Sequence, residues 1–200
     1  TYSDLKNKRV FISGGGSGIG ATIVENFCEQ RSEVYFIDID MKASYKLIKK
    51  IKKKGFKIPK FIECNILDIK KLQNIIKDII SRKGAIHCLI NSAANDDRHT
   101  TEQVNEKYWE NRMGINLKHY FFAAQAVVKG MKKIKSGSIV NLSSVSWMLG
   151  EGDKVVYETA KSAVVGLTRS FAQEFGKYNI RTNSVIPGSI ATERQIKHWL

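Results

Sequence analysis

Residues 9–20 of this 200-residue chain read RVFISGGGSGIG, and this stretch decides how the rest of the chain folds. Its first four residues form a short apolar run, and glycines then follow at Gly14, Gly18 and Gly20. A helical period comes next, over residues 21–30, with its apolar side chains on one face. A buried strand, a glycine-rich turn and an amphipathic helix in this order predict the first unit of an α/β domain.

The rest of the chain repeats this alternation of short apolar runs and longer helical patterns. Strands that are separated by helices and are apolar on both faces predict a parallel sheet with helices on both sides. This is a doubly wound Rossmann fold of the α/β class. We find no internal repeat or linker, so we expect a single domain over residues 1–200. The predicted strands are 9–12, 34–37, 60–64, 85–90, 138–142 and 180–186, and the predicted helices are 21–30, 42–54, 70–82, 105–130 and one that carries Tyr157 and ends near 178.

The glycine-rich turn is the first candidate site. A turn between the first strand and the first helix is where a dinucleotide pyrophosphate binds backbone N–H groups and the positive end of the helix. Ser17 adds a hydroxyl, and Asp38 closes the second strand, where a carboxylate binds ribose hydroxyls and repels a 2′-phosphate. These residues predict NAD in preference to NADP. The alternative is that Asp38 only caps the helix that follows it.

A tyrosine and a lysine form the second candidate site. Tyr157 and Lys161 are four residues apart, so on a helix they lie on the same face. A phenol titrates near ~10, and a neighbouring cation lowers that pKa towards neutrality, which would make Tyr157 a base. Ser144, thirteen residues before Tyr157, could hold the oxygen of a substrate while Tyr157 removes its proton. The alternative is a half-buried ring beside a solvated charge.

Composition narrows the classes of function. The net charge is +14, but the cations are mainly lysines, and the densest run, over residues 49–54, contains no aromatic residue. We therefore expect no specific nucleic-acid binding. No apolar stretch reaches the ~18 residues of a membrane span, so we expect no membrane partner and a cytoplasmic location. Cys28, Cys64 and Cys88 are odd in number and widely spaced, which predicts reduced thiols and no metal site.

Together these motifs resemble the short-chain dehydrogenase/reductase family over the whole chain. Besides the glycine turn, the matching features are Asn91-Ser92-Ala93-Ala94 after a strand, a helical Asn116, the set Ser144, Tyr157 and Lys161, and Pro187-Gly188 followed by Thr192. The resemblance implies the following cofactor-binding residues: Gly14, Ser17, Gly18, Ile19, Gly20, Asp38, Asn65, Ile66, Asn91, Ala93, Tyr157, Lys161, Pro187, Gly188, Ile190 and Thr192.

The resemblance also implies roles for the catalytic residues. Tyr157 removes the hydroxyl proton, Ser144 fixes the substrate oxygen, and Lys161 lowers the pKa of Tyr157 and binds the nicotinamide ribose. Asn116 supports a chain of waters that carries the proton to solvent. A homodimer or homotetramer is the family expectation.

Shorter stretches indicate the substrate. Residues 95–99, Ser146-Trp147 and residues 192–195 look like the subset of the family that oxidises aldoses at C1, as xylose and galactose dehydrogenases do. The predicted substrate is a sugar or polyol, the product an aldonolactone, and the predicted substrate residues are Asn95, Ser144, Ser146, Trp147 and Tyr157. Two alternatives stay open: a reductase of ketones or oxoacyl thioesters, and a catalytically inactive nucleotide-binding scaffold.

The chain departs from the family pattern at a few positions. Ala94 stands in place of the usual glycine, Ser92 in place of an asparagine, and Asn65 in place of an aspartate. The sequence stops at Leu200, so we expect the C-terminal edge strand and the substrate loop of the family to be absent.

Overall fold

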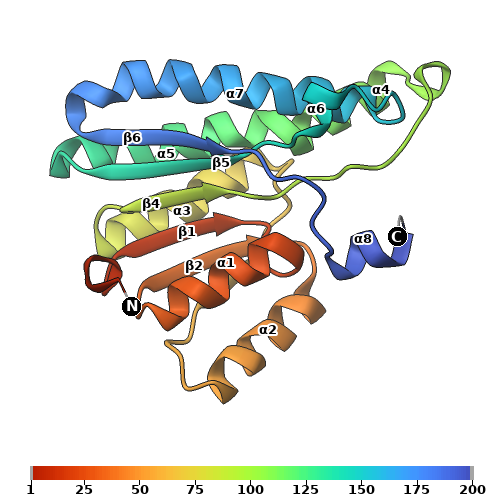
Figure 1. Cartoon of the computed structure of the whole chain (residues 1–200). Coiled ribbons are helices and arrows are strands. Elements are labelled where there is room, and N and C mark those ends of the chain that lie inside the picture. Colours follow the sequence, from red (N-terminus) through yellow and green to blue (C-terminus); the bar gives the residue numbers. More distant parts are fainter. Residues whose placement is uncertain (1, 199–200) are drawn as a thin grey trace.

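The computed structural model describes residues 2–198 and contains one six-stranded sheet, in which all strands run parallel. The strand order is β3-β2-β1-β4-β5-β6 (Figure 1). The order reverses between β1 and β4, so a crevice opens at the carboxyl ends of these two strands, where folds of this class bind ligands. The strands are β1 (Arg9–Ser13), β2 (Glu33–Asp38), β3 (Lys60–Glu63), β4 (Cys88–Asn91), β5 (Gly137–Leu142) and β6 (Ile180–Val185).

Helices cover both faces of the sheet, which confirms the doubly wound fold (Figure 1). On one face, Val24 and Leu47 pack with Val10 and Phe36 of the sheet; on the other, Leu72, Val127 and Phe171 pack with Phe11. The first face carries α1 (Gly18–Glu29) and α2 (Met41–Lys53), and the second carries α3 (Ile69–Lys83), α5 (His119–Ile134) and α7 (Val155–Phe175). Shorter helices are α4 (Glu106–Met113), α6 (Ser146–Leu149) and α8 (Glu193–His198).

The helical stretch predicted over residues 105–130 is present, with an irregularity that was not predicted. The structure divides it into α4, one turn of π-helix (Gly114–Lys118) and α5, which continues to Ile134. Asn116 lies in the π turn, where its side chain binds the backbone of Asn95. A π turn inserts one extra residue into a helix, and hydrophobic periodicity alone does not reveal it.

Strand β6 also departs from the expectation of strands that are apolar on both faces. Ile180 and Thr182 are buried, whereas Arg181 and Asn183 are exposed, so one side of β6 faces solvent in the part of the chain that the structure describes. Over the same residues, none of the helices is both long and apolar enough to cross a bilayer. The three cysteines are free thiols, and burial raises the pKa of Cys28 and of Cys88 to about 12.

Candidate functional site

The glycine turn packs closely against the end of β4. Gly14 has a positive φ of 69°, and a Cβ there would lie 2.6 Å from the Cα of Ala93 at the end of β4. A Cβ on Gly20 would overlap the carbonyl oxygen of Gly14, so this position also requires glycine. The turn leads directly into α1, whose first N–H groups are free of side-chain caps. This arrangement fits a pyrophosphate group.

Asp38 ends β2 and points at the glycine turn. Its Oδ2 accepts a hydrogen bond from the N–H of Gly16 at 2.8 Å, and its Oδ1 accepts one from the N–H of Asp40 at 2.9 Å. The N-cap of α2 is Asp40, whose side chain accepts from the N–H of Ala43. The structure therefore gives the capping role to Asp40 and leaves Asp38 beside the candidate nucleotide site. Past the end of β3, Asn65 Oδ1 accepts from the N–H of Leu67, and Ile66 is buried.

A serine and a histidine that the sequence analysis missed hold the turn against β4. Ser13 Oγ accepts from the N–H groups of Ser92 at 3.2 Å and Ala93 at 3.4 Å, and it lies 3.5 Å from His119 Nε2. His119 is fully buried, and burial lowers its pKa to about 3, so the ring is neutral. In the tautomer that leaves Nε2 unprotonated, the neutral ring accepts a hydrogen bond from the Ser13 hydroxyl, and the serine oxygen stays available to the two backbone N–H groups.

Buried polar side chains form a ladder of hydrogen bonds that joins two strands and a helix beside the site. Asn91 Nδ2 donates to Asn141 Oδ1 at 2.9 Å, and Asn141 Nδ2 donates to Thr168 Oγ1 at 3.0 Å. The ladder therefore connects β4, β5 and α7 at the same depth. The predicted residue Asn91 is thus a buried member of this ladder, and Asn141 and Thr168 are members that the sequence analysis missed.

One cavity of about 210 Å³ brings together three of the predicted catalytic and substrate residues, Ser144, Ser146 and Tyr157. Ser144 follows β5, Tyr157 lies in the first turn of α7, and a hydrogen bond joins the two side chains. Ser144 Oγ also lies 2.9 Å from Ser146 Oγ. The cavity is lined by Ile19, Ala94, Asp96, Ser143, Ser144, Val145, Ser146, Glu151, Lys154, Tyr157, Pro187, Gly188, Ser189, Ile190, Thr192, Arg194 and Gln195.

The prediction that Lys161 lowers the pKa of Tyr157 is wrong for this structure. Burial raises the pKa of Tyr157 to about 12; the charges of Asp96 and Glu151 raise it further, and only the hydrogen bond with Ser144 lowers it. The ammonium of Lys161 lies 5.5 Å from the centroid of the Tyr157 ring and binds other groups: it donates to Tyr120 Oη at 3.0 Å and to the carbonyl of Leu142 at 2.7 Å.

Lys161 itself is fully buried, and burial lowers its pKa from 10.5 to about 7, while the charge of Asp96 acts in the opposite direction. The spacing of Tyr157 and Lys161 did predict their shared helix face. It did not predict how deep the ammonium lies, because the acceptors that hold it come from β5 and α5.

Asn116 anchors the loop that follows β4. The side chain is fully buried; its Oδ1 accepts from the N–H of Asn95 at 2.8 Å, and its Nδ2 donates to the carbonyl of Asn95 at 3.0 Å. Both ends of the amide therefore bind one residue. The support of a water chain by Asn116 stays a prediction.

Two predicted substrate residues do not line the cavity. The side chain of Asn95 turns into its own loop and accepts from the N–H of Asp97 at 2.9 Å. Trp147 on α6 points its indole N–H into the protein, where the described residues offer it no partner. These two predictions are corrected, whereas Ser144, Ser146 and Tyr157 do line the cavity.

Charged residues that the sequence analysis left out of the site line the cavity instead. Asp96 and Glu151 approach Tyr157 closely enough to raise its pKa. Helix α8 binds the same loop, because Gln195 Nε2 donates to Asp96 Oδ2 at 2.6 Å and Arg194 Nη2 donates to Asp97 Oδ1 at 2.6 Å. The two adjacent acidic residues after β4 were the available sequence signal for this part of the site. Their partners on α8 lie 97 and 99 positions further along the chain.

The segment after β6 completes the cavity. Pro187, Gly188, Ile190 and Thr192 all line it, as the resemblance implied. The carbonyl of Pro187 accepts from the N–H of Val145 at 3.1 Å, and Thr192 Cγ2 would contact a Cβ on Gly18 at 3.5 Å. The segment therefore crosses the carboxyl ends of the strands beside the glycine turn before it enters α8 (Figure 1).

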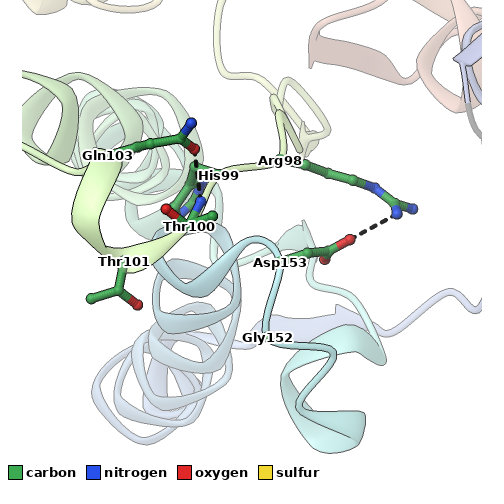
Figure 2. Close-up of a pocket in the computed structure, with 7 residues that line it drawn as sticks. All are labelled: Arg98, His99, Thr100, Thr101, Gln103, Gly152 and Asp153. Atoms are coloured by element: carbon green, nitrogen blue, oxygen red, sulfur yellow. Dashed lines mark hydrogen bonds and ion pairs between the residues drawn. The ribbon is translucent and has the colours of Figure 1, made fainter.

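A second, more open cavity of about 420 Å³ lies beside the start of α7 (Figure 2). Figure 2 shows its ion pair between Arg98 and Asp153, at 2.7 Å, and the hydrogen bond from the N–H of Thr100 to Gln103. It holds none of the predicted site residues. Its lining residues are Arg98, His99, Thr100, Thr101, Gln103, Gly152 and Asp153.

The fold and the site define a nicotinamide-dependent oxidoreductase, and comparisons with known proteins agree. Residues 8–199 match the family described as short chain dehydrogenase. The chain is 42% identical to D-xylose 1-dehydrogenase of Caulobacter vibrioides, over 99% of this chain and 78% of that protein. It is 39% identical to a probable galactose dehydrogenase of Rhizobium meliloti, over 100% of this chain and 78% of that protein.

A solved structure gives the same result. The aldohexose dehydrogenase of Thermoplasma acidophilum, in ligand-free form, superimposes with a TM-score of 0.86 at 29% identity, covering 98% of this chain and 72% of that one. The chain belongs to the short-chain dehydrogenase family and is an oxidoreductase that resembles sugar dehydrogenases acting on CH–OH donors.

Proposed function

We propose that this protein oxidises the C1 hydroxyl of an aldose to the aldonolactone with NAD, with Tyr157 as the base. The observation that carries the proposal is that the carboxylates of Asp96 and Glu151 line the same small cavity as Tyr157 and Ser144. Carboxylates accept hydrogen bonds from sugar hydroxyls, and a cavity with convergent polar groups suits a neutral polyol. The names of the relatives, xylose and galactose dehydrogenases, support the same substrate class.

Ser144 and Tyr157 have different roles in the proposed oxidation. Ser144 Oγ donates to the C1 oxygen and orients it towards the ionised Tyr157 oxygen, which takes the proton of the C1 hydroxyl and becomes a neutral phenol as the C1–O double bond forms. When bound, the nicotinamide ring supplies the acceptor for the hydride that leaves C1. Because the pKa of Tyr157 is raised to about 12, the base form grows with pH, so we expect the rate of oxidation to rise with pH on the acid side of its optimum.

NAD is the proposed cofactor because of Asp38. Its carboxylate already binds two backbone N–H groups at the end of β2, which fixes a negative charge beside the glycine turn. A 2′-phosphate placed there would be repelled, whereas ribose hydroxyls would donate to the carboxylate. The remaining residues proposed for the cofactor are those of the glycine turn, the end of β4 and the segment after β6.

The experiment is a set of NADH absorbance assays with D-xylose, D-galactose and D-glucose in the presence of NAD. We expect the absorbance to rise with at least one aldose. Tyr157→Phe should lower the rate by at least ~10³-fold without loss of NADH binding, because it removes the base and keeps the ring. The matched control is Tyr45→Phe on α2, whose ring is 52% exposed and which should keep the full rate.

Other outcomes separate the alternatives. A 3-oxoacyl-[acyl-carrier-protein] reductase of Thermotoga maritima is 31% identical to this chain, so ketones and oxoacyl thioesters are assayed with NADH in the reverse direction. Turnover of these compounds alone would assign the reductase alternative. Tight NADH binding without turnover of any substrate would assign the inactive scaffold. The homodimer or homotetramer stays a prediction that sedimentation measures directly.

A further inference from the structure

The ammonium of Lys161 is held in a small cage of neutral groups. The side chain is 1% exposed, and Nζ lies between two aromatic rings, 5.1 Å from the centroid of Tyr120 and 5.5 Å from that of Tyr157. Among the described residues, its hydrogen-bond acceptors are Tyr120 Oη at 3.0 Å and the Leu142 carbonyl at 2.7 Å. A buried ammonium is tolerated only where such acceptors replace water.

Tyr120 closes this cage. It is fully buried on α5, four residues past Asn116, and its hydroxyl donates to the Leu142 carbonyl at 3.0 Å while it accepts from Lys161. The Lys161 ammonium, the Tyr120 hydroxyl and the Leu142 carbonyl are therefore joined in a triangle by three hydrogen bonds, and each group is held by the other two. Burial raises the pKa of Tyr120 well above its usual value, so the phenol stays neutral. Unlike Tyr157, Tyr120 does not line the cavity.

We propose that Tyr120 is a positioning residue, whose hydroxyl holds the Lys161 ammonium beneath the Tyr157 ring in its charged form. The role in turnover rests on the proposed function, because the direction of this ammonium matters to the rate only if Lys161 binds the nicotinamide ribose beside Tyr157, as the resemblance implies. The geometry leaves one ammonium N–H for a group outside the cage, and the two acceptors decide its direction. A phenylalanine at position 120 would fill the same space without an acceptor.

The other ionisable groups around Lys161 are few. Asp96, from the loop after β4, favours the charged form of the lysine. His119, on the same helix as Tyr120, is neutral and adds no competing charge, although its own pKa is lowered by Lys161. Tyr157 lies above the ammonium on α7 and is neutral below about pH 12. Tyr120 is thus the side chain that supplies a direct hydrogen bond.

The first experiment measures the pH profile of Tyr120→Phe with the aldose that the wild-type protein turns over. Loss of one hydrogen bond to a charged group should move the alkaline limb of kcat to lower pH by about one unit, since the ammonium then loses its proton more easily. We expect kcat to fall about tenfold at the optimum, with KM for the aldose unchanged within about twofold. A lower melting temperature with an unchanged pH profile would reduce Tyr120 to a structural residue and overturn the proposal.

The matched control is Tyr35→Phe. Tyr35 is also buried, 4% exposed, and its hydroxyl donates to Glu33 on β2, away from the cavity. This variant should lose some stability and keep the wild-type pH profile. If Tyr35→Phe moved the profile as Tyr120→Phe does, the shift would report general loosening and the proposal would fail.

A second measurement does not depend on turnover. Urea unfolding of the wild type, Tyr120→Phe, Lys161→Met and the double variant forms a double-mutant cycle. We expect coupling of about tenfold in the unfolding constant at pH 6, because the Tyr120 hydroxyl accepts a hydrogen bond from the charged lysine. Additive effects would overturn the proposal. If no aldose is turned over, the proposed function fails, and this cycle still decides whether Tyr120 holds Lys161. If Tyr120→Phe alone folds poorly, the double variant should fold better, because Lys161→Met removes the charge that lacks an acceptor.

Discussion

Replacing Lys161 by methionine should make the protein more stable and inactive, because methionine fills the space without a buried charge. Burial lowers the pKa of Lys161 from 10.5 to about 7. Each pH unit of such a depression costs about 1.4 kcal/mol of folding free energy when the group is charged in both states, so the cost below pH 7 is roughly 5 kcal/mol.

The sign of the pH dependence follows from proton binding. Between pH 7 and 10.5 the unfolded chain keeps the lysine proton and the folded chain releases it, so the stability of the wild type rises with pH. The gain of Lys161→Met over the wild type should therefore be largest at pH 6 and should shrink by about 4 kcal/mol by pH 10. Effects of other groups, such as the raised pKa of Tyr157, are common to both proteins and cancel.

Urea unfolding followed by circular dichroism at pH 6, 7, 8, 9 and 10 measures this difference. The control is Lys49→Met on the exposed side of α2, which should show no difference that depends on pH. A flat difference between Lys161→Met and the wild type across this range would refute the reasoning. It would mean that the ammonium is solvated in the folded protein and keeps the pKa it has in the unfolded chain.

Three further predictions concern the rest of the site. Gly20→Ala places a methyl group on a backbone carbonyl, so it should cost about 1–3 kcal/mol in urea unfolding and weaken NADH binding at least tenfold by fluorescence titration; the control Gly166→Ala, in open space on α7, should cost nothing and gain up to about 1 kcal/mol. Asp38→Ser removes the charge beside the glycine turn and should lower the preference for NAD over NADP by at least about tenfold in kcat/KM; an unchanged preference would place the ribose elsewhere. Asp96→Asn removes a charge that raises the pKa of Tyr157, so the acid limb of kcat should move to lower pH, while KM for the aldose rises about tenfold; a KM equal to that of the wild type would remove Asp96 from the sugar site.

Local patterns predicted the fold well because its elements are locally determined. Strands β1, β2 and β4 are short, mainly apolar runs, and the cap Asp40 and the glycine turn act within a few positions of the helices they begin. The π turn around Asn116 was missed because a distant residue, Asn95, stabilises it. Periodicity and spacing predicted the six strands in their order along the chain, and they predicted the helix that carries Tyr157.

The site was predicted in part for the same reason. Tyr157 and Ser144 share a cavity as expected, but spacing along a helix fixes only the face on which Lys161 lies. Its depth depends on Tyr120 and Leu142, which belong to other elements. Asp96 belonged to the stretch 95–99 that indicated the substrate, but nothing in its neighbourhood revealed that it would approach Tyr157. Contacts between distant segments decide these features, and one sequence does not show them.

Helix α7 carries the proposed base Tyr157 at one end and ends in the apolar core at the other, where Phe171 and Phe175 stack with ring centroids 5.0 Å apart. The backbone carbonyl of Lys161 also accepts a hydrogen bond from the hydroxyl of Ser143, which links this helix to the residue that follows β5. Partial opening of the molecule near the active centre therefore requires that the most protected part of the chain opens too. Heat inactivation should accordingly coincide with loss of the whole fold.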